Sequence, residues 1–322
     1  MREDWFELCT GEAPLRYPDF LDFSAWIEHT PFAFWIIDAI RPESLAELGT
    51  HQGQSYLTFC EALLDVQPAN AYAIDTWQGD EHAGYYGAEI LETLKAHHDE
   101  KYGAFSQLMQ MTFTEAAEQI ADGTIDLLHI DGRHFADDVR HDFDEWLPKM
   151  SSRGVVLMHD TRVFERGFGV HEVWADLQGK YPSFEFHHGN GLGVLAVGSE
   201  IPEKLDLFLE ATGDPSRAKL LRDFYSRQGV AVSDRYELTA LRGIADERLD
   251  AIHGLTAGWD QANREIELLT HKAEELEARR NQLRTQLKAS QGELKALRAS
   301  ASWKITKPIR TASSKIRRGN SS

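Results

Sequence analysis

Two apolar runs that end in acidic and histidine residues decide the fold: Ile125-Asp126-Leu127-Leu128-His129-Ile130, followed by Asp131-Gly132-Arg133-His134, and Val155-Val156-Leu157-Met158, followed by His159-Asp160. Short aliphatic runs of this kind are typical of buried parallel strands. Ligands of open α/β sheets bind outside the carboxyl ends of the strands. If the two strands are neighbours, about 5 Å apart, their terminal side chains converge on one spot. Two carboxylates and two imidazoles there could hold a metal ion, move a proton, or both.

The rest of the first 200 residues alternates between expected strands and helices. Strands are expected at 45–49, 71–75 and 108–111, and helices at 30–40, 56–64, 88–97, 114–121, 139–147 and 170–177. Segments 183–187 and 192–197 form a hairpin across Gly189-Asn190-Gly191. This alternation predicts an α/β fold with a doubly wound, mostly parallel sheet and an antiparallel hairpin at one edge.

The net charge of −18 is unevenly distributed. Residues 255–322 contain 14 Lys and Arg against 7 Asp and Glu, whereas residues 1–254 contain 20 against 45. An acidic globule with a basic tail is a poor nucleic-acid binder, because phosphate contacts need positive charge around the site. We therefore expect no nucleic-acid partner. The basic tail is compatible with a membrane surface or another anionic partner.

Cysteine content and the absence of apolar segments favour a cytoplasmic protein. Cys9 and Cys60 are the only cysteines, which predicts no disulfide framework. The acidic N-terminus leads into no apolar core of a signal peptide, and no apolar stretch approaches the ~20 residues of a spanning helix. We expect a cytoplasmic location, peripheral to the inner membrane if the tail binds lipid.

Beyond a domain at 1–200, the sequence predicts a helical extension at 201–254, a coiled coil at 255–300 and a basic, disordered tail at 301–322. The extension is interrupted at Gly213-Asp214-Pro215. A heptad repeat begins at Trp259, and ten of its twelve a and d positions are apolar. This pattern favours a coiled coil, and hence a homo-oligomer, over a solitary solvated helix. The a positions are Trp259, Ile266, Ala273, Arg280, Leu287 and Leu294, and the d positions are Ala262, Leu269, Leu276, Leu283, Ser290 and Leu297.

A glycine-containing turn, Glu47-Leu48-Gly49-Thr50-His51-Gln52-Gly53-Gln54-Ser55, separates the first expected strand from an amphipathic helix. Such glycines let the backbone approach a ligand, and the helix N-terminus offers free N–H groups. The turn matches neither the dinucleotide-binding nor the P-loop pattern. Asp75 ends the next strand and is placed to accept hydrogen bonds from ribose hydroxyls. Together these features predict an adenosine-containing cofactor.

These motifs resemble those of the class I S-adenosylmethionine-dependent methyltransferases. The resemblance rests on Glu-x-Gly-x-x-x-Gly at residues 47–53, on Asp75, and on Asp131-Gly-x-His134 before His159-Asp160. Residues 75–84, 167–170 and 188–193 add to it and indicate the branch of bacterial sugar O-methyltransferases, including the macrolide-sugar enzymes and relatives in surface-polysaccharide clusters. The resemblance covers roughly residues 40–198 and implies the Rossmann-like fold of this class.

The resemblance also implies roles for the site residues. The turn, with Glu47, Gly49, Thr50, Gly53 and Ser55, would contact the methionine and ribose part of S-adenosylmethionine. Asp75 would bind the ribose hydroxyls, and Thr76 and Trp77 would lie at the adenine side. His134 would be the catalytic base, and Asp131, His159 and Asp160 would occupy the metal-ligand positions.

His159 departs from the resemblance, because metal-dependent relatives have a carboxylate at this position. Mg²⁺ prefers oxygen ligands, whereas imidazole suits zinc, iron or nickel. Either no metal is needed or a different divalent metal binds. A cation held by Asp131 and Asp160 would lower the pKa of an acceptor hydroxyl, and a histidine such as His134 suits general-base catalysis near neutral pH.

Several residues have competing interpretations. We expect His129 to be a packed, hydrogen-bonded histidine within its strand. His187 and His188 either border the pocket or cap the edge hairpin. Trp77, Tyr85 and Tyr86 either form an aromatic lid over the ligand or only cover the sheet edge.

The leading hypothesis is a methyltransferase acting on a sugar hydroxyl of a bacterial surface glycan or its lipid-linked precursor. A metal-dependent hydrolase using the Asp/His cluster is one alternative, although it would need no adenosine pocket. A non-catalytic coiled-coil scaffold for glycosyltransferases is another.

The C-terminal tail has its own hypothesis. Residues 302–310, Ser-Trp-Lys-Ile-Thr-Lys-Pro-Ile-Arg, resemble an element found at the ends of coiled coils in bacterial glycosyltransferases and polysaccharide-assembly proteins. Its Trp and Ile beside basic residues would fit docking on an anionic membrane. The alternative is a solubilising disordered end.

Overall fold

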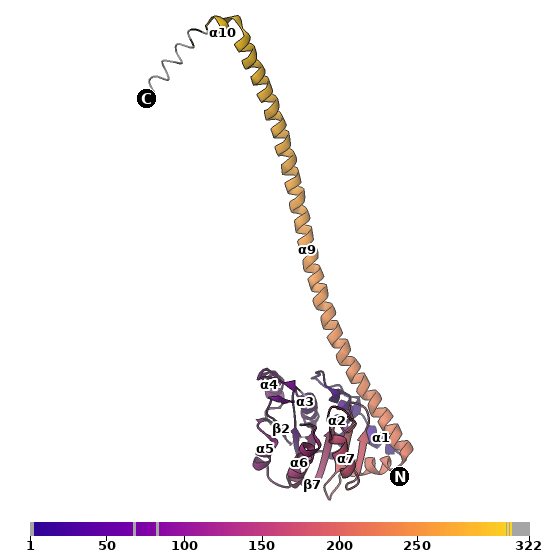
Figure 1. Cartoon of the computed structure of the whole chain (residues 1–322). Coiled ribbons are helices and arrows are strands. Elements are labelled where there is room, and N and C mark those ends of the chain that lie inside the picture. Colours follow the sequence, from indigo (N-terminus) through magenta and orange to yellow (C-terminus); the bar gives the residue numbers. More distant parts are fainter. Residues whose placement is uncertain (1–2, 67–68, 82–83, 307, 309, 311–322) are drawn as a thin grey trace, which may run out of the picture. The chain divides into compact units, whose positions relative to one another are not determined.

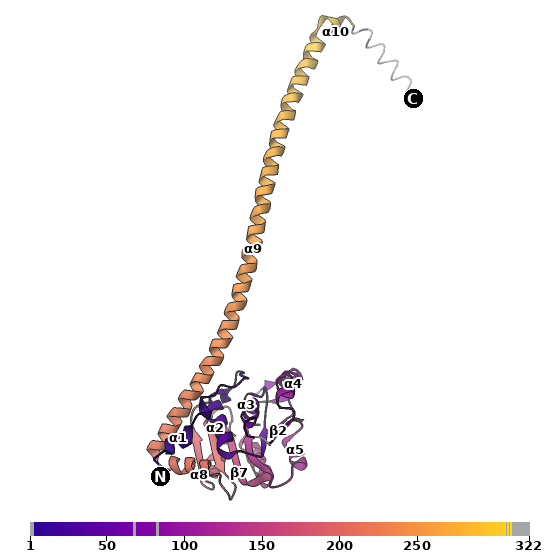
Figure 2. The same cartoon turned by 180° about the vertical axis from the view of Figure 1, so that it is seen from behind.

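The computed structural model describes residues 3–66, 69–81, 84–306, 308 and 310 (Figures 1 and 2). The chain divides into two compact units, residues 1–241 and residues 242–322.

A seven-stranded sheet forms the centre of the first unit. Its order is β5-β2-β1-β6-β7-β9-β8, and all neighbouring pairs are parallel except those that involve β9. The predicted doubly wound sheet is confirmed, and so is the hairpin, with β8 at the edge. The strands are β1 (Ser44–Leu48), β2 (Asn70–Asp75), β5 (Ser106–Gln110), β6 (Ile125–Ile130), β7 (Met150–His159), β8 (Ser183–Phe186) and β9 (Leu192–Ala196).

Helices cover both faces of this sheet because its strands are apolar on both sides. Leu127 of β6 belongs to the hydrophobic cluster under α2 (Thr30–Ile40), α3 (Gln54–Leu63) and α4 (Glu89–Tyr102). The adjacent Leu128 belongs to the opposite cluster, under α5 (Phe113–Gln119), α6 (Ala136–Trp146) and α7 (Val170–Leu177). The two layers lie on opposite sides of the strands (Figure 1).

Smaller elements complete the unit. On the side of α2 they are α1 (Trp5–Thr10), α8 (Glu203–Thr212) and the first turns of α9 (Pro215–Ala299). The others are the short helices η1 (Ala13–Leu15), η2 (Ala25–His29) and η3 (Leu147–Lys149), and a two-stranded ribbon of β3 (Gly79–Asp80) and β4 (Gly84–Tyr85).

The position of the site follows from the strand order. The chain builds β1, β2 and β5 outward on one side and then crosses to β6 on the other side of β1. A crevice opens where the order reverses, at the carboxyl ends of β1 and β6. Gly49 follows β1 there, and Asp131 follows β6, with the Asp131 N–H donating to the Leu48 carbonyl at 2.9 Å.

The predicted helical region after residue 200 is confirmed. Its predicted break is also present, because α8 ends at Thr212 and α9 begins at Pro215, where the Asp214 carboxylate accepts from the backbone N–H groups of Ser216 and Arg217. Ala218, Leu221, Tyr225, Gly229 and Val232 of α9 are buried. The expected boundaries at residues 200, 254 and 300 stay predictions.

The second unit consists of the remainder of α9 and of α10 (Ala301–Ile305). The leucines and isoleucines at the heptad positions are exposed, for example Leu269 at 57% and Leu276 at 63%. The coiled coil stays a prediction. The prediction of a disordered tail at 301–322 is wrong for residues 301–305, which form α10, and residues 307, 309 and 311–322 lie outside the described part of the chain. Among the described residues, no helix combines the length and hydropathy needed to cross a membrane.

Candidate active site

The turn between β1 and α3 depends on two glycines. Gly49 has φ +89°, and a Cβ at this position would collide with the Asp131 backbone carbonyl. Gly53 has φ +90° and would collide with the Leu94 side chain. L-residues with a Cβ rarely adopt this left-handed region. The glycines therefore bring the β1 turn against the end of β6, which forms one wall of the crevice.

Asp75, at the end of β2, holds this turn in place. Its Oδ2 accepts the backbone N–H groups of Thr50 at 3.0 Å and His51 at 2.9 Å, and its Oδ1 accepts the Trp77 N–H at 2.7 Å. The carboxylate thus organises the loop and also faces the crevice. The predicted ribose contact stays a prediction, and a ribose would share these oxygens with the backbone.

A cavity of about 250 Å³ lies at the carboxyl ends of β1, β2 and β6. Three residues expected at the cofactor, Gly49, Asp75 and Thr76, line it. Its other lining residues are His51, Gly79, Asp80, Tyr86, Thr112, Phe113, Asp131, Gly132, Arg133 and His134.

Two residues expected at the cofactor lie elsewhere. Glu47 is fully buried, and its Oε2 accepts from His129 Nδ1 at 2.8 Å. His129 Nε2 in turn accepts from the Trp26 indole N–H at 3.1 Å, which confirms the packed, hydrogen-bonded histidine. Trp77 is buried, with its indole N–H donating to the His51 carbonyl at 2.9 Å. Neither Glu47 nor Trp77 is among the residues that line the cavity, so a direct cofactor contact of either stays a prediction.

A second cavity, of about 170 Å³, adjoins the first. It contains the predicted residues Thr50, Gly53, Ser55, His159 and Asp160. Residues shared by the two linings are Gly49, His51, Asp131 and His134. The second cavity is completed by Ser24, Ala25, Gln52 and Gln54.

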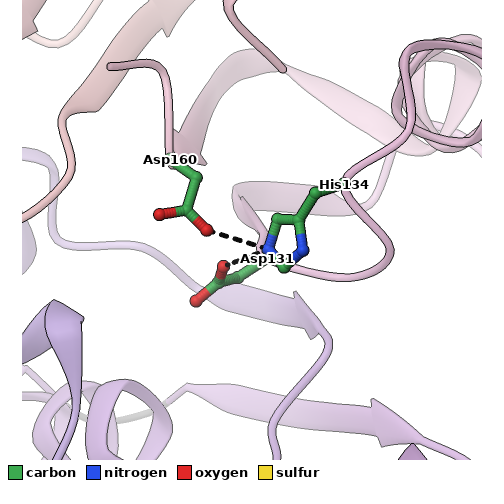
Figure 3. Close-up of side chains that lie close together, drawn as sticks. All are labelled: Asp131, His134 and Asp160. Atoms are coloured by element: carbon green, nitrogen blue, oxygen red, sulfur yellow. Dashed lines mark ion pairs between the residues drawn. The ribbon is translucent and has the colours of Figure 1, made fainter. Parts of the chain in front are cut away.

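Asp131, His134 and Asp160 converge at the junction of the two cavities (Figure 3). His134 Nε2 lies 2.9 Å from Asp160 Oδ2 and 3.5 Å from Asp131 Oδ1. The His134 ring stacks on Phe168, with 4.4 Å between ring centroids. Asp160 has φ +61°, a strained conformation for a residue with a side chain. The predicted convergence of the two strand ends is therefore present.

The electrostatics of this cluster favour charged histidines. Burial alone would lower the pKa of His134, but its hydrogen bonds to Asp131 and Asp160 and their charges raise the pKa to about 9. Burial likewise opposes the charge on His159, yet the same two carboxylates raise its pKa to about 9. Burial would raise the pKa of Asp131, but the charge of His159 and the hydrogen bonds from both imidazoles hold it well below its usual value.

The metal-ligand role expected of His159 stays a prediction, but the contacts of its two ring nitrogens do not favour it. His159 Nε2 lies 2.9 Å from the Gly189 carbonyl oxygen, and Nδ1 lies 3.1 Å from Asp131 Oδ1. A carbonyl oxygen and a carboxylate can only accept hydrogen bonds. Both ring nitrogens therefore carry hydrogen, and no lone pair is left for a metal ion.

The other three side chains place ligand-type atoms within 4.8 Å of one another. These atoms are, however, already paired, because His134 Nε2 lies at both carboxylates and His159 Nδ1 lies at Asp131. Two imidazolium groups balance the charge of the two carboxylates without a metal ion. This donor set, with its charge already balanced, does not fit a divalent metal ion.

Some site residues were missed by the sequence analysis. Thr112 and Phe113 line the first cavity, and a capping box formed by Thr112 and Glu115 marks their position. This Thr-x-x-Glu signal is visible in the sequence. Ser24 and Ala25 carry no comparable signal, since only tertiary packing brings the N-terminal segment to the second cavity.

The aromatic and histidine residues with competing interpretations have distinct positions in the structure. Tyr86 lines the first cavity, and its ring centroid lies 4.8 Å from that of His51, whereas Tyr85 is 76% exposed. Neither His187 nor His188 lines the two cavities, and the His188 ring packs on that of His29 at 4.7 Å.

Part of the chain is similar to a known protein family. Residues 46–161 match the model of a family described as a methyltransferase domain. This segment runs from β1 to Thr161, just beyond Asp160, and it contains the predicted site. The match supports a methyltransferase domain over these residues, and the expected bounds of 1–200 stay a prediction.

The chain is also 47% identical over 218 residues to the uncharacterized protein y4gI of Sinorhizobium fredii. That match covers 67% of this chain and 24% of y4gI, so the chain spans about a quarter of the length of this relative.

Among solved structures, the chain is similar to the methyltransferase PaMTH1 of Podospora anserina bound to SAH, with 14% identity, a TM-score of 0.42, and coverage of 61% of this chain and 88% of that one. It is also similar to the O-methyltransferase TomG of Streptomyces achromogenes in complex with SAM. The identity is 14% and the TM-score 0.42, and the match covers 62% of this chain and 91% of TomG.

Proposed function

We propose that this chain is an S-adenosylmethionine-dependent methyltransferase that methylates a hydroxyl group, most specifically a sugar hydroxyl of a bacterial surface glycan or its precursor. One observation carries the proposal. Two cavities meet at Asp131 and His134, one lined by Asp75 and the start of the glycine turn, the other by Asp160 and the rest of that turn. A donor in the first cavity and an acceptor in the second would meet at a base.

The proposed reaction is an in-line displacement. A lone pair of the acceptor oxygen forms a bond to the methyl carbon, and the carbon–sulfur bond breaks, with its electron pair remaining on sulfur. The hydroxyl proton passes to Nε2 of neutral His134, and the resulting N–H is held by Asp160 Oδ2, as at the observed distance of 2.9 Å. General-base assistance of this kind typically contributes 10²–10⁴-fold.

The second cavity favours a polar acceptor. Its lining includes the polar residues Ser24 and Gln54, besides Thr50 and Ser55, which the resemblance assigns to the cofactor. Asp160 Oδ1 is buried and, among the described residues, has no hydrogen-bond partner. Buried carboxylate oxygens are normally paired, so this atom is suited to accept a hydroxyl group of the substrate. The resemblance to sugar O-methyltransferases supports a carbohydrate acceptor, but the cavity itself selects only for polarity.

A metal-dependent hydrolase is less well supported. It would use the Asp/His cluster but would need neither the glycine turn nor the adjoining cavity beside Asp75. A non-catalytic scaffold would retain the exposed heptad face while having no use for a half-buried His134 paired with two carboxylates. The domain match over residues 46–161 also favours a methyltransferase.

Partners are part of the proposal. The exposed a and d residues of α9 support a homo-oligomer through residues 255–300. The tail element includes Trp303 and Ile305, the latter 77% exposed, beside Lys304. This combination supports docking on an anionic membrane surface, on the cytoplasmic side of the inner membrane, or on glycosyltransferases.

Calorimetry with S-adenosylhomocysteine tests the proposed function. We expect the full-length chain to bind this product and Asp75→Asn to lose at least tenfold in affinity. Asp65→Asn, at an exposed acid outside both cavities, is the matched control. Absence of binding at millimolar product would remove the methyltransferase proposal. Once an acceptor is identified, full activity of Asp131→Ala/His134→Ala would refute the catalytic roles but leave the class intact.

A further inference from the structure

His159 is held from both sides at the end of β7. On one side its Nε2 donates to the Gly189 carbonyl at 2.9 Å, and the same oxygen also accepts from His29 Nε2 at 3.0 Å. Gly189 has φ +54°, and a Cβ there would lie 2.9 Å from His29 Nε2. The loop between β8 and β9 thus needs glycine at this position to present its carbonyl to both rings.

On the other side, His159 faces the two catalytic carboxylates. Its Nδ1 lies 3.1 Å from Asp131 Oδ1 and 3.6 Å from Asp160 Oδ1, and the side chain is only 3% exposed. Fixed between a carbonyl and two carboxylates, the ring is a doubly protonated cation with no free lone pair. It therefore delivers positive charge to the place where the resemblance predicts a carboxylate and a divalent ion.

The charge of His159 accounts for the difference between this cluster and the metal site that the resemblance predicts. Replacing a carboxylate by an imidazolium changes the local charge by two units, which equals the charge of one divalent cation. With His159 present, Asp131 and Asp160 are balanced by His159 and by the proton carried on His134. A divalent ion added to this cluster would meet His159 instead of a third oxygen ligand, and repulsion between buried like charges is strong.

We propose that His159 is a positioning residue that takes the place of the divalent cation, so that this methyltransferase site works without metal. His159 holds the Asp131 carboxylate and keeps both acids ionised for His134. This inference rests on the proposed function, but its test does not.

Binding of Mn²⁺ to the full-length chain, followed by electron paramagnetic resonance, provides the test. We expect the wild-type chain to bind Mn²⁺ no better than a variant carrying Asp160→Asn. The variant His159→Glu, which restores the carboxylate, should bind Mn²⁺ at least tenfold more tightly than the wild type. His141→Glu, at a side chain on α6 that is 63% exposed, adds the same charge outside the cluster and should gain nothing.

Two further measurements distinguish failure of this inference from failure of the proposed function. Nitrogen-15 NMR of labelled histidine should show two imidazoles with both nitrogens protonated at pH 7.5, and one of the two should be absent from His159→Gln. Product binding by calorimetry reports on the methyltransferase proposal separately. Tight Mn²⁺ binding by the wild type that Asp160→Asn abolishes would overturn the inference. The inference would also be overturned if a folded His159→Glu variant bound Mn²⁺ no better than the wild type. If His159→Glu does not fold, His159→Asp replaces it in this comparison.

Discussion

At the scale of single residues, two positions illustrate how the backbone builds the crevice. Gly49 and Gly123 both have positive φ, +89° and +72°. A Cβ on Gly49 would meet the Asp131 carbonyl, whereas a Cβ on Gly123 would meet nothing within 4 Å. Comparing alanine substitutions at Gly49 and Gly123 therefore separates the free-energy cost of the left-handed dihedral angle from the cost of a steric collision.

We predict that Gly123→Ala lowers the free energy of unfolding by about 1–2 kcal/mol, from the left-handed backbone alone. Gly49→Ala should cost at least twice as much and should abolish binding of S-adenosylhomocysteine, because β1 and β6 must separate. Urea denaturation and calorimetry measure the two effects. Equal losses in both variants would show that the turn tolerates a side chain.

The paired imidazoles make stability depend on pH. The pKa values of His134 and His159 are raised to about 9 in the folded chain from 6.5. Their contribution is therefore complete below pH 6.5 and is lost as the pH rises through 9. A shift of this size in one group is worth about 3 kcal/mol, and the two histidines share the same carboxylates.

We predict that the free energy of unfolding falls by about 3 kcal/mol between pH 6.5 and pH 9.5. The variant His159→Gln should be less stable at pH 6.5 and should lose less over the same range. Denaturation curves at several pH values measure this pH dependence. If His159→Gln lost as much stability over this range as the wild type, His159 would not be a source of the pH dependence. His134 must also lose its proton to act as a base, so methyl transfer should rise with pH toward about 9.

At the scale of elements, α5 links the stability of one helix to the cavity. Thr112 caps this helix, its hydroxyl accepting from the Glu115 N–H while the Glu115 carboxylate accepts from the Thr112 N–H. Thr112 and Phe113 also line the first cavity. Loss of the cap should therefore affect both stability and ligand binding.

We predict that Thr112→Ala lowers the free energy of unfolding by about 1 kcal/mol and weakens binding of S-adenosylhomocysteine severalfold. Thr112→Ser, which keeps the hydroxyl, should retain both properties. If serine and alanine behave alike in chemical denaturation and calorimetry, the cap does not support the cavity.

Element types were the most predictable part of the fold. β6 and α7 follow directly from continuous apolar runs and from helical spacing, because each segment buries the faces that its own pattern defines. β7 begins earlier than expected, at Met150, because backbone pairing with β6 extends past the apolar run through a register shift near Ile125. Pairing of this kind depends on a neighbouring strand and leaves no local signal.

At the scale of the whole molecule, the heptad face of α9 predicts self-association. Leu268 and Leu269 are adjacent and both exposed, at 70% and 57%. Only Leu269 occupies a d position, whereas Leu268 lies on the outer side of the repeat. The pair offers a matched comparison within one helix.

We predict that Leu269→Glu shifts the full-length chain toward monomer, because a buried charge disrupts the seam. Leu268→Glu should leave the oligomer intact. Sedimentation velocity at several concentrations measures the result. A wild-type chain that stays monomeric, or two variants that dissociate equally, would refute the coiled coil.

The sequence by itself determined the sheet, its helical layers and the convergence of Asp131, His134 and Asp160, because strand ends at a switch point must meet. Tertiary structure alone decided the contacts of His159. The Gly189 carbonyl comes from a distant hairpin, and it occupies the nitrogen that a metal would need. Tertiary packing likewise turned Glu47 toward His129 and brought Ser24 to the second cavity. Local patterns specify what an element buries, but the partner of a buried polar group is fixed only when distant segments pack together.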